Sequence, residues 1–273
     1  MNTNQIYNKF GGNVLASGGF GCVFDPPLKC KGKNREKNKI SKLLTKKHAI
    51  NEFNEIKAIK QKLEKIPNYS HYFLVDDYSI CYPDKLTEED LENYEDKCTA
   101  LPKDNIKKDN INSSLNMMML INMPNGGVPV DDYIYDDGSF DKLIPLNASL
   151  INLLNGGIVP MNARHIFHCD IKDSNVLVKV DRGVQSKLID WGLSTIYIPN
   201  STNHKIPKSW TNRPLQYNVP FSTLLFTDLF LEKYSKYLKN GGKKEYVSLK
   251  PFVLNYIYLW IKKRGSGHYK LIN

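Results

Sequence analysis

Two short motifs in the second half of the chain limit its possible folds more than any other feature. They are His168-Cys169-Asp170-Ile171-Lys172-Asp173-Ser174-Asn175 and Leu188-Ile189-Asp190-Trp191-Gly192. A coincidence of so many residue types has odds of roughly one in 10⁷ in any one window. Residues 176–180 and 187–189 have the composition of short strands, and Asp181-Arg182-Gly183 suits a hairpin turn between them. We therefore predict that Asn175 and Asp190 lie at neighbouring strand ends.

These motifs resemble the catalytic loop and the metal-binding motif of protein kinases. Phosphoryl transfer to a hydroxyl needs an acceptor for its proton, divalent metal to neutralise the triphosphate, and a cation near the moving phosphoryl group. The resemblance implies that Asp170 orients the substrate hydroxyl and that Lys172 contacts the γ-phosphate. It further implies that Asn175 and Asp190 hold magnesium ions (Mg2+), with ATP as the phosphoryl donor.

A segment near the N-terminus resembles the glycine-rich loop of the same family, whose backbone amides lie over the phosphates. It is Leu15-Ala16-Ser17-Gly18-Gly19-Phe20-Gly21-Cys22-Val23. A run of glycines alone is most often an ordinary turn. Together with the downstream motifs, it predicts that these residues bind the nucleotide. Ala16 stands where the family usually has its first glycine, which should stiffen the loop slightly without blocking Gly18 and Gly21.

One lysine of the crowded basic region 29–47 is expected to bind ATP. We select Lys42 because, unlike its neighbours, it is bracketed by apolar residues in the strand-like run Ile40-Ser41-Lys42-Leu43-Leu44. Residues 49–59 then have the apolar periodicity of a helix. We predict that Glu55 of this helix pairs with Lys42, and Glu52, one turn earlier, is the alternative.

A methionine-rich stretch, residues 115–122, has the composition of the last strand of a small lobe, and Met123-Pro124-Asn125-Gly126-Gly127 suits a hinge. Such a strand is more often plain core. The kinase resemblance implies that the adenine ring lies against this segment, with Met123 among its contacts. Residues 144–155 predict an apolar helix, which Gly156-Gly157 should end.

An insertion is predicted at about residues 80–112, between the fourth and fifth strands of the small lobe, and residues 87–94 within it have the sequence of a capped acidic helix. A docking role and a solvated spacer both remain open. The insertion, residues 122–127 and residues 213–222 together resemble the divergent serine/threonine kinases of giant nucleocytoplasmic DNA viruses. The resemblance implies a viral protein, and Lys172 is the serine/threonine form of the loop.

The predicted fold class is α+β: a bilobal, protein-kinase-like fold with a small β-rich N-lobe and a mainly helical C-lobe. A length of 273 residues is enough to bury the core of one such catalytic domain. A helix candidate at 252–262 lies close to the end of the sequence, which leaves open a shortened large lobe. The expected divisions are an N-terminal extension at 1–9 and a kinase domain at 10–273, with its N-lobe at 10–122, hinge at 123–127 and C-lobe at 128–273.

The net charge of +10 is concentrated in residues 29–47 and 233–270. Solvated lysines and a site that holds a triphosphate account for it, and no aromatic-basic motif accompanies the lysines, so we expect a protein substrate and not nucleic acid. The five cysteines are odd in number and lack Cys-x-x-Cys spacing, which favours reduced thiols and an intracellular location, in host cytoplasm or virion if viral. We recognise no apolar stretch of bilayer length and expect neither secretion nor a membrane span.

Departures from the family pattern leave two other functions open. Cys169 replaces the arginine that normally follows the histidine, so activity should not depend on a phosphorylated activation segment. Val219-Pro220-Phe221 stands where Ala-Pro-Glu is usual. A small-molecule phosphotransferase of the aminoglycoside or choline kinase type shares several motif residues but commonly has histidine in place of Lys172. A pseudokinase scaffold would suit Ala16 and a shortened lobe, although every identifiable catalytic position carries the required residue.

Overall fold

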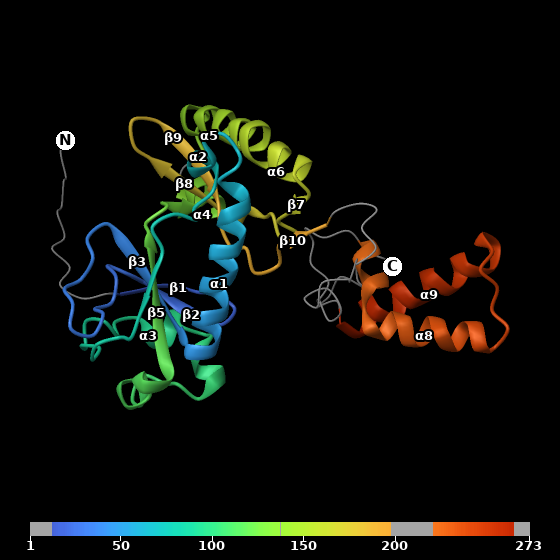
Figure 1. Cartoon of the computed structure of the whole chain (residues 1–273), viewed down its shortest axis with the longest axis horizontal. Helices are drawn as coiled ribbons and strands as arrows, with labels where there is room; N and C mark the ends of the chain where they lie inside the picture. The colour runs from blue at the N-terminus through green and yellow to red at the C-terminus, as the bar shows by residue number, and fades with distance from the viewer. Residues whose placement is uncertain (1–12, 137, 198–220, 265–273) are drawn as a thin grey trace. The chain divides into compact units, whose positions relative to one another are not determined.

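The computed structural model describes residues 13–136, 138–197 and 221–264 (Figure 1). They form two compact units. The first contains the chain up to Met161 together with Asp173–Gly192. The second contains Asn162–Lys172 and the chain from Leu193 onward. The fold class is α+β, as predicted, with a β-rich N-terminal sheet and a helical C-terminal region.

The first unit is built on a five-stranded antiparallel sheet in the order β1-β2-β3-β5-β4 (Figure 1). Leu43 and Leu120 face each other across β3 and β5 and are fully buried. A slip of one residue would turn both to the other face, so this pair helps to fix the register. The strand bounds are β1 Asn13–Ser17, β2 Gly21–Asp25, β3 Lys39–Thr45, β4 Ser79–Cys81 and β5 Met118–Pro124.

Helix α1, Lys46–Leu63, lies along this sheet and buries Ile56, Ile59 and Leu63. It contains the predicted helix 49–59. The predicted hairpin is also present, because β8 (Val176–Val180) pairs with β9 (Val184–Leu188) on either side of the Asp181-Arg182-Gly183 turn. The other elements of this unit include α2 (Tyr69–Tyr72), β6 (Val128–Pro129), α4 (Val130–Asp136), α5 (Phe140–Asn152), the π-helix η4 (Leu153–Ile158) and η5 (Asp173–Asn175).

The second unit has its own small core. Thr227 caps α8, because its Oγ1 accepts a hydrogen bond from the Phe230 N–H at 3.3 Å, and Oγ1 also lies 2.8 Å from the Tyr256 hydroxyl of α9. The rings of Phe230 and Tyr256 meet edge to face. The predicted helix 252–262 lies within α9. The elements are β7 (Ile166–Phe167), β10 (Thr195–Ile196), η6 (Phe221–Phe226), α8 (Asp228–Lys239) and α9 (Tyr246–Arg264). Helix α6 (Val159–Ala163) leads from one unit to the other.

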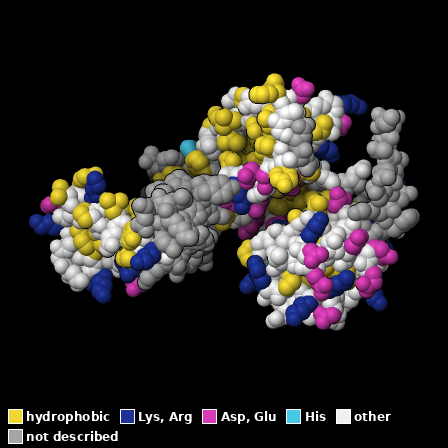
Figure 2. Space-filling view, turned by 180° about the vertical axis from the view of Figure 1, so that it is seen from behind, with side chains coloured by type: hydrophobic (Ala, Val, Ile, Leu, Met, Phe, Trp, Pro, Cys, Tyr) yellow, Lys and Arg dark blue, Asp and Glu magenta, His cyan; other side chains and the backbone are white. Residues whose placement is uncertain are grey.

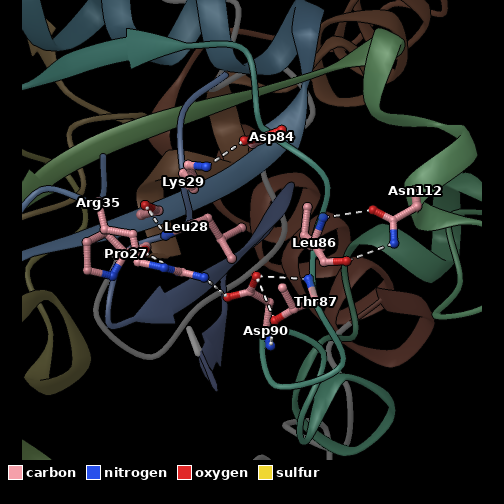
Figure 3. A network of polar contacts seen from close by, with 10 residues as sticks. Pro27, Leu28, Lys29, Arg35, Asp84, Leu86, Thr87, Asp90 and Asn112 are labelled. Carbon is pink, nitrogen blue, oxygen red and sulfur yellow. Dashed lines mark hydrogen bonds and ion pairs between the residues drawn. The ribbon is translucent and has the colours of Figure 1, made fainter. Parts of the chain in front are cut away.

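The insertion lies between β4 and β5, as predicted, but the expected helix at 87–94 was wrong. Residues 88–93 form turns and α3 (Tyr94–Lys97) begins only afterwards. The carboxylate of Asp90 is buried and accepts a hydrogen bond from the Thr87 N–H at 3.0 Å, while Arg35 approaches it at 2.7 Å (Figure 3). This ion pair with a distant segment outweighs the local helix signal. Three short 3-10 helices follow: η1 (Leu101–Asp104), η2 (Ile111–Ser113) and η3 (Leu115–Met117).

The prediction of reduced cysteines was wrong. Disulfides join Cys22 to Cys98 and Cys30 to Cys81, and only Cys169 takes no part in them. The paired cysteines are 76 and 51 residues apart in sequence, and only the folded insertion brings them together. Neither the odd number nor the missing Cys-x-x-Cys spacing could reveal such pairs. An intracellular location stays a prediction.

The apolar helix does not end at its glycines, contrary to prediction. Helix α5, η4 and α6 form one continuous helical run (Figure 1). A Cβ on Gly156 would collide with the ring and hydroxyl of Tyr72, and one on Gly157 would lie 2.8 Å from the Tyr72 Cβ. The glycines therefore allow α2 to approach the helix closely, and the local helix widens to a π-turn at this contact.

The same helical run, Phe140–Ala163, is long and apolar enough to cross a membrane by length and composition. The expectation that no apolar stretch reaches bilayer length was therefore wrong. Figure 2 shows apolar side chains gathered over α5. However, Leu146 and Leu153 are buried, and the Ser149 hydroxyl donates to Ser186 of β9 at 3.0 Å. This part of the run packs on the β8–β9 hairpin, and 17% of the apolar window is buried inside the protein.

The glycine contact with α2 leads to a stability prediction. Gly156→Ala should destabilise the protein by about 1 kcal/mol, because overpacking against Tyr72 costs about 1–3 kcal/mol and exceeds the gain of about 1 kcal/mol in helix propensity. Chemical denaturation of Gly156→Ala, Tyr72→Ala and the double variant measures this coupling. The double variant should be more stable than the sum of the single effects indicates. Stabilisation by Gly156→Ala alone would show that the contact imposes no constraint.

Candidate active site

The predicted glycine-rich loop is the turn between β1 and β2. Its base is the pair Ser17 and Cys22, which lie opposite each other, and the Gly18 N–H donates to the Gly21 carbonyl at 2.8 Å. A Cβ on Gly21 would collide with the backbone of Leu43 in β3, so the strand can approach only because this residue is glycine. Leu15 and Ala16 are exposed on β1, Cys22 is buried, and Val23 is half-buried on β2.

The loop lies over the lysine that the sequence singled out. A Cβ on Gly18 would be 3.4 Å from Cε and 3.6 Å from Nζ of Lys42. At the tip, the exposed ring of Phe20 stacks on His48 of α1, with ring centroids 4.4 Å apart. Gly19 has open space around it. Backbone amides, a lysine ammonium group and a helix thus converge on one small region of the first unit.

Lys42 pairs with Glu52 and not with Glu55, so the predicted partner was wrong and the alternative is correct. The Lys42 Nζ lies 2.7 and 2.8 Å from the two carboxylate oxygens of Glu52. The reason is the start of α1 at Lys46, immediately after β3, which places Glu52 in the second turn and within reach of the strand. Glu55 lies a further turn along. The position of the helix start relative to β3 is the signal that would have identified Glu52.

Glu55 instead contributes to a local excess of negative charge. Its side chain keeps much of its surface in solvent, yet burial of the carboxyl raises its pKa, and the charges of Glu52 and Asp190 add to the effect. Asp190 is therefore close enough to α1 for its charge to act on Glu55. Lys42 pairs with one of these three acids, Glu52. Such a field favours an additional cation.

Asn175 and Asp190 lie at neighbouring strand ends, as predicted. Val176 pairs with Leu188, and the Ile189 N–H donates to the Asn175 carbonyl at 3.0 Å, so both residues are held at the open end of the β8–β9 hairpin. Asn175 is buried and Asp190 is exposed, with a left-handed backbone at φ 64°.

The next residue, Trp191, anchors this end of the hairpin. It is buried and packs edge to face on Phe73, with ring centroids 5.5 Å apart. The Gly192 N–H donates to Oδ1 of Asp190 at 3.4 Å. These contacts hold the Asp190 carboxylate in place after the strand has ended.

The donor set at this end suits magnesium. Amide and carboxylate oxygens are the ligands that Mg2+ prefers, and the ion commonly uses one or two carboxylates together with substrate phosphates and water. Among the described residues, no group of three or more His, Cys, Asp or Glu side chains could hold a metal ion without such help. Asn175 and Asp190 therefore fit a magnesium ion that arrives with a nucleotide.

The catalytic-loop motif belongs to the second unit. His168 and Asp170 are buried, and the Asp170 N–H donates to Nδ1 of His168 at 3.3 Å, which fixes that ring nitrogen as an acceptor. The Lys172 Nζ lies 3.6 Å from Oδ2 of Asp170. Cys169, which lies between His168 and Asp170 in the sequence, has a left-handed backbone at φ 62°. The motif thus brings a carboxylate and an ammonium group together, as the sequence resemblance implies.

The segment predicted as the hinge is partly strand. Met123 pairs with Ile40 inside the sheet, and β5 continues to Pro124. Gly127, at φ 98°, accepts no side chain because a Cβ would collide with the Val178 carbonyl. The Asn125 side chain accepts from the Gly127 N–H at 2.9 Å and donates to Asp25 at 3.2 Å. Asn125 was not predicted to have a role, and it stabilises this turn.

Comparison with known families agrees with this geometry. The family model described as "Protein kinase domain" matches residues 11–212. No curated protein matches the chain significantly.

Proposed function

Because the family model covers residues 11–212 of 273, the chain belongs to the protein kinase domain family, and we propose that it is an ATP- and magnesium-dependent serine/threonine protein kinase. One observation carries the proposal. The Lys42–Glu52 ion pair lies below Gly18, in the same unit that holds Asn175 and Asp190 at one hairpin end. A triphosphate with its metal needs such a set of amides, cation and oxygen ligands.

Within this proposal, the residues of the first unit bind the nucleotide. Backbone amides of residues 18–21 lie over the phosphates, and Lys42, oriented by Glu52, contacts the α- and β-phosphates. Asn175 and Asp190 would hold magnesium, which neutralises the triphosphate when bound. Met123 supports the adenine ring from β5.

The residues of the second unit serve the acceptor. Asp170 accepts the proton of the substrate hydroxyl, and Lys172 stabilises the negative charge of the moving phosphoryl group. Their separation of 3.6 Å allows one hydroxyl to meet both groups. Lys172 is also the basis for proposing serine or threonine as the acceptor, since this residue is the serine/threonine form of the loop.

The assignment to the giant-virus subgroup is part of the same proposal. It rests on the insertion and on residues 122–127, which the structure describes. Residues 213–220 lie outside the described residues. They include Val219 and Pro220 of the segment that replaces Ala-Pro-Glu.

Labelled ATP tests the proposal directly. Purified protein with Mg2+ should label serine or threonine in one or more members of a panel of basic and acidic proteins, and acid hydrolysis identifies the labelled residue. The Asp170→Ala variant should give no label. Transfer only to an aminoglycoside or choline would favour a small-molecule phosphotransferase. Binding of ATP without any transfer would instead indicate a pseudokinase scaffold.

A further inference from the structure

The insertion contacts the glycine-rich loop at its base. Cys98, at the end of α3, forms a disulfide with Cys22 of β2, and their Cα atoms are 5.4 Å apart. The next two residues, Thr99 and Ala100, donate their backbone N–H groups to the Ser17 hydroxyl oxygen at 3.1 and 3.0 Å. We name residues 98–100 the strap.

The strap contacts both strands at the base of the loop, at Ser17 of β1 and at Cys22 of β2. Ser17 and Cys22 lie opposite each other across β1 and β2, and they are the last paired residues before the turn. The four residues between them are Gly18-Gly19-Phe20-Gly21. The strap therefore restrains Ser17 and Cys22, the two residues that flank the turn at 18–21.

The strap is itself firmly seated. Cys98 and Ala100 are buried, and Tyr94 of α3 is buried with its hydroxyl donating to the Ile106 carbonyl at 2.8 Å. The apolar cluster that contains these residues also includes Val14 and Cys22 of the β1–β2 hairpin, so the insertion and the hairpin share one core. Figure 3 shows the polar contacts that secure the preceding part of the insertion, including Arg35 with Asp90 and the paired bonds of Asn112 to Leu86.

We propose that the strap positions the glycine-rich loop for nucleotide binding, and that reduction of the Cys22–Cys98 disulfide weakens this binding. The proposal rests on the function proposed above. A glycine-rich turn has more conformational freedom to lose than any other sequence of its length. Restraint of both stems before the nucleotide arrives lowers the entropy that binding must overcome, which is preorganisation.

The reductive step is a dithiol exchange that requires local opening, because Cys22 and Cys98 are buried. A dithiol reductant supplies two electrons and two protons, the Cys22–Cys98 S–S bond breaks, both cysteines become thiols, and the reductant is oxidised to its own disulfide. The hydrogen bonds from Thr99 and Ala100 to Ser17 remain available, so the reduced loop should be looser without being released completely. Reduction should therefore weaken the binding of Mg·ATP without abolishing it.

The second disulfide provides a matched control. Cys30–Cys81 also ties the insertion boundary to the N-terminal region, but it joins β4 to the segment between β2 and β3 and does not contact the loop. Cys98→Ala and Cys81→Ala each remove one disulfide. Ser17→Ala removes the acceptor oxygen of the strap, together with weaker contacts of that hydroxyl to the Gly18 carbonyl at 3.5 Å and Cys22 Sγ at 3.6 Å, and Ser17→Thr keeps an oxygen in its place.

Calorimetric titration with Mg·ATP measures the proposed effect. Cys98→Ala and Ser17→Ala should each raise Kd about fivefold to tenfold, as expected for the loss of one or two restraining contacts. Ser17→Thr should recover most of the affinity that Ser17→Ala loses, whereas Cys81→Ala should leave Kd unchanged even if it lowers the melting temperature. In steady-state kinetics, KM for ATP should rise in Cys98→Ala with kcat unchanged. Equal losses in Cys98→Ala and Cys81→Ala would overturn the proposal in favour of a merely structural disulfide.

Hydrogen exchange without nucleotide separates this proposal from the proposed function. Amides of residues 18–21 should exchange faster in Cys98→Ala and in Ser17→Ala than in Cys81→Ala. Adding dithiothreitol to a Cys30→Ser/Cys81→Ser background should produce the same acceleration, because only the Cys22–Cys98 bond is left to reduce. Unchanged amide exchange at residues 18–21 would overturn the proposed role of the strap, whatever the activity of the enzyme. Failure of the unaltered protein to bind Mg·ATP would instead overturn the proposed function.

Discussion

Replacement of Asp190 by asparagine is expected to abolish phosphoryl transfer. Asp190 supplies a carboxylate at the open end of the β8–β9 hairpin, where Asn175 offers a neutral oxygen. Asparagine keeps the size of the side chain but removes the charge that would hold magnesium, so binding of the metal–nucleotide complex should fail as well. Transfer of label from ATP and titration with Mg·ATP test both consequences.

Asp170→Asn is the matched comparison, because it also changes a carboxylate to an amide. Asp170 lies in the catalytic loop of the second unit beside Lys172. Its loss should lower kcat by at least about 100-fold, the usual range for general-base catalysis, while Kd for Mg·ATP stays nearly unchanged. Circular dichroism and thermal unfolding must first show that both variants fold. Equal loss of nucleotide affinity in the two variants would contradict their separate roles.

Lys42→Met is expected to cut kcat/KM severely, by at least about 100-fold, because the variant loses the ammonium group that contacts the phosphates. Lys46→Met is the closest control. Lys46 lies at the start of α1, with its side chain exposed, and its Nζ is 5.5 Å from the ring centre of Tyr82. Its loss should change stability by no more than about 0.5 kcal/mol and should leave kcat/KM nearly unchanged.

The partner of Lys42 gives a second comparison within the same experiment. Glu52→Gln should lower kcat/KM because the ion pair that orients Lys42 is lost, whereas Glu55→Gln should have little effect. Lys39 is a further control, since its Nζ pairs with Glu36 and Asp77 away from Lys42's partner. If Lys39→Met or Lys46→Met proved the inactivating change, the nucleotide site would be assigned to the wrong lysine. If none of the lysines mattered while a small alcohol or amine was phosphorylated, the small-molecule alternative would replace the protein kinase.

The sequence alone was sufficient for features that depend on neighbouring residues. The β8–β9 hairpin follows from two short apolar strands and a glycine turn, and this hairpin is enough to bring Asn175 and Asp190 to one end. Lys42 could be selected because apolar residues on both sides mark a buried strand. These signals depend on neighbouring residues, and no contact with a distant segment changes the local structure that they predict.

Other features depended on contacts between distant residues. A glycine pair usually ends a helix, but the ring of Tyr72 occupies the space that side chains at positions 156 and 157 would need, and the helix continues past them. The acidic run 87–94 resembles a capped helix, but Arg35 draws the Asp90 carboxylate into an ion pair and the run forms turns. In both cases a partner far away in sequence decided the local conformation.

The catalytic motifs and their residue types were therefore determined by the sequence itself, since their spacing is short enough to identify without a fold. The tertiary structure decided which glutamate meets Lys42, because that depends on where α1 begins relative to β3. It also decided the cysteine pairs and the contacts of the strap. Cys22 and Cys98 are 76 residues apart in sequence, and Ser17 is farther still from Thr99 and Ala100, which donate to it. No local pattern carries information about such distant contacts, since they form only when the insertion and the β1–β2 hairpin share one core.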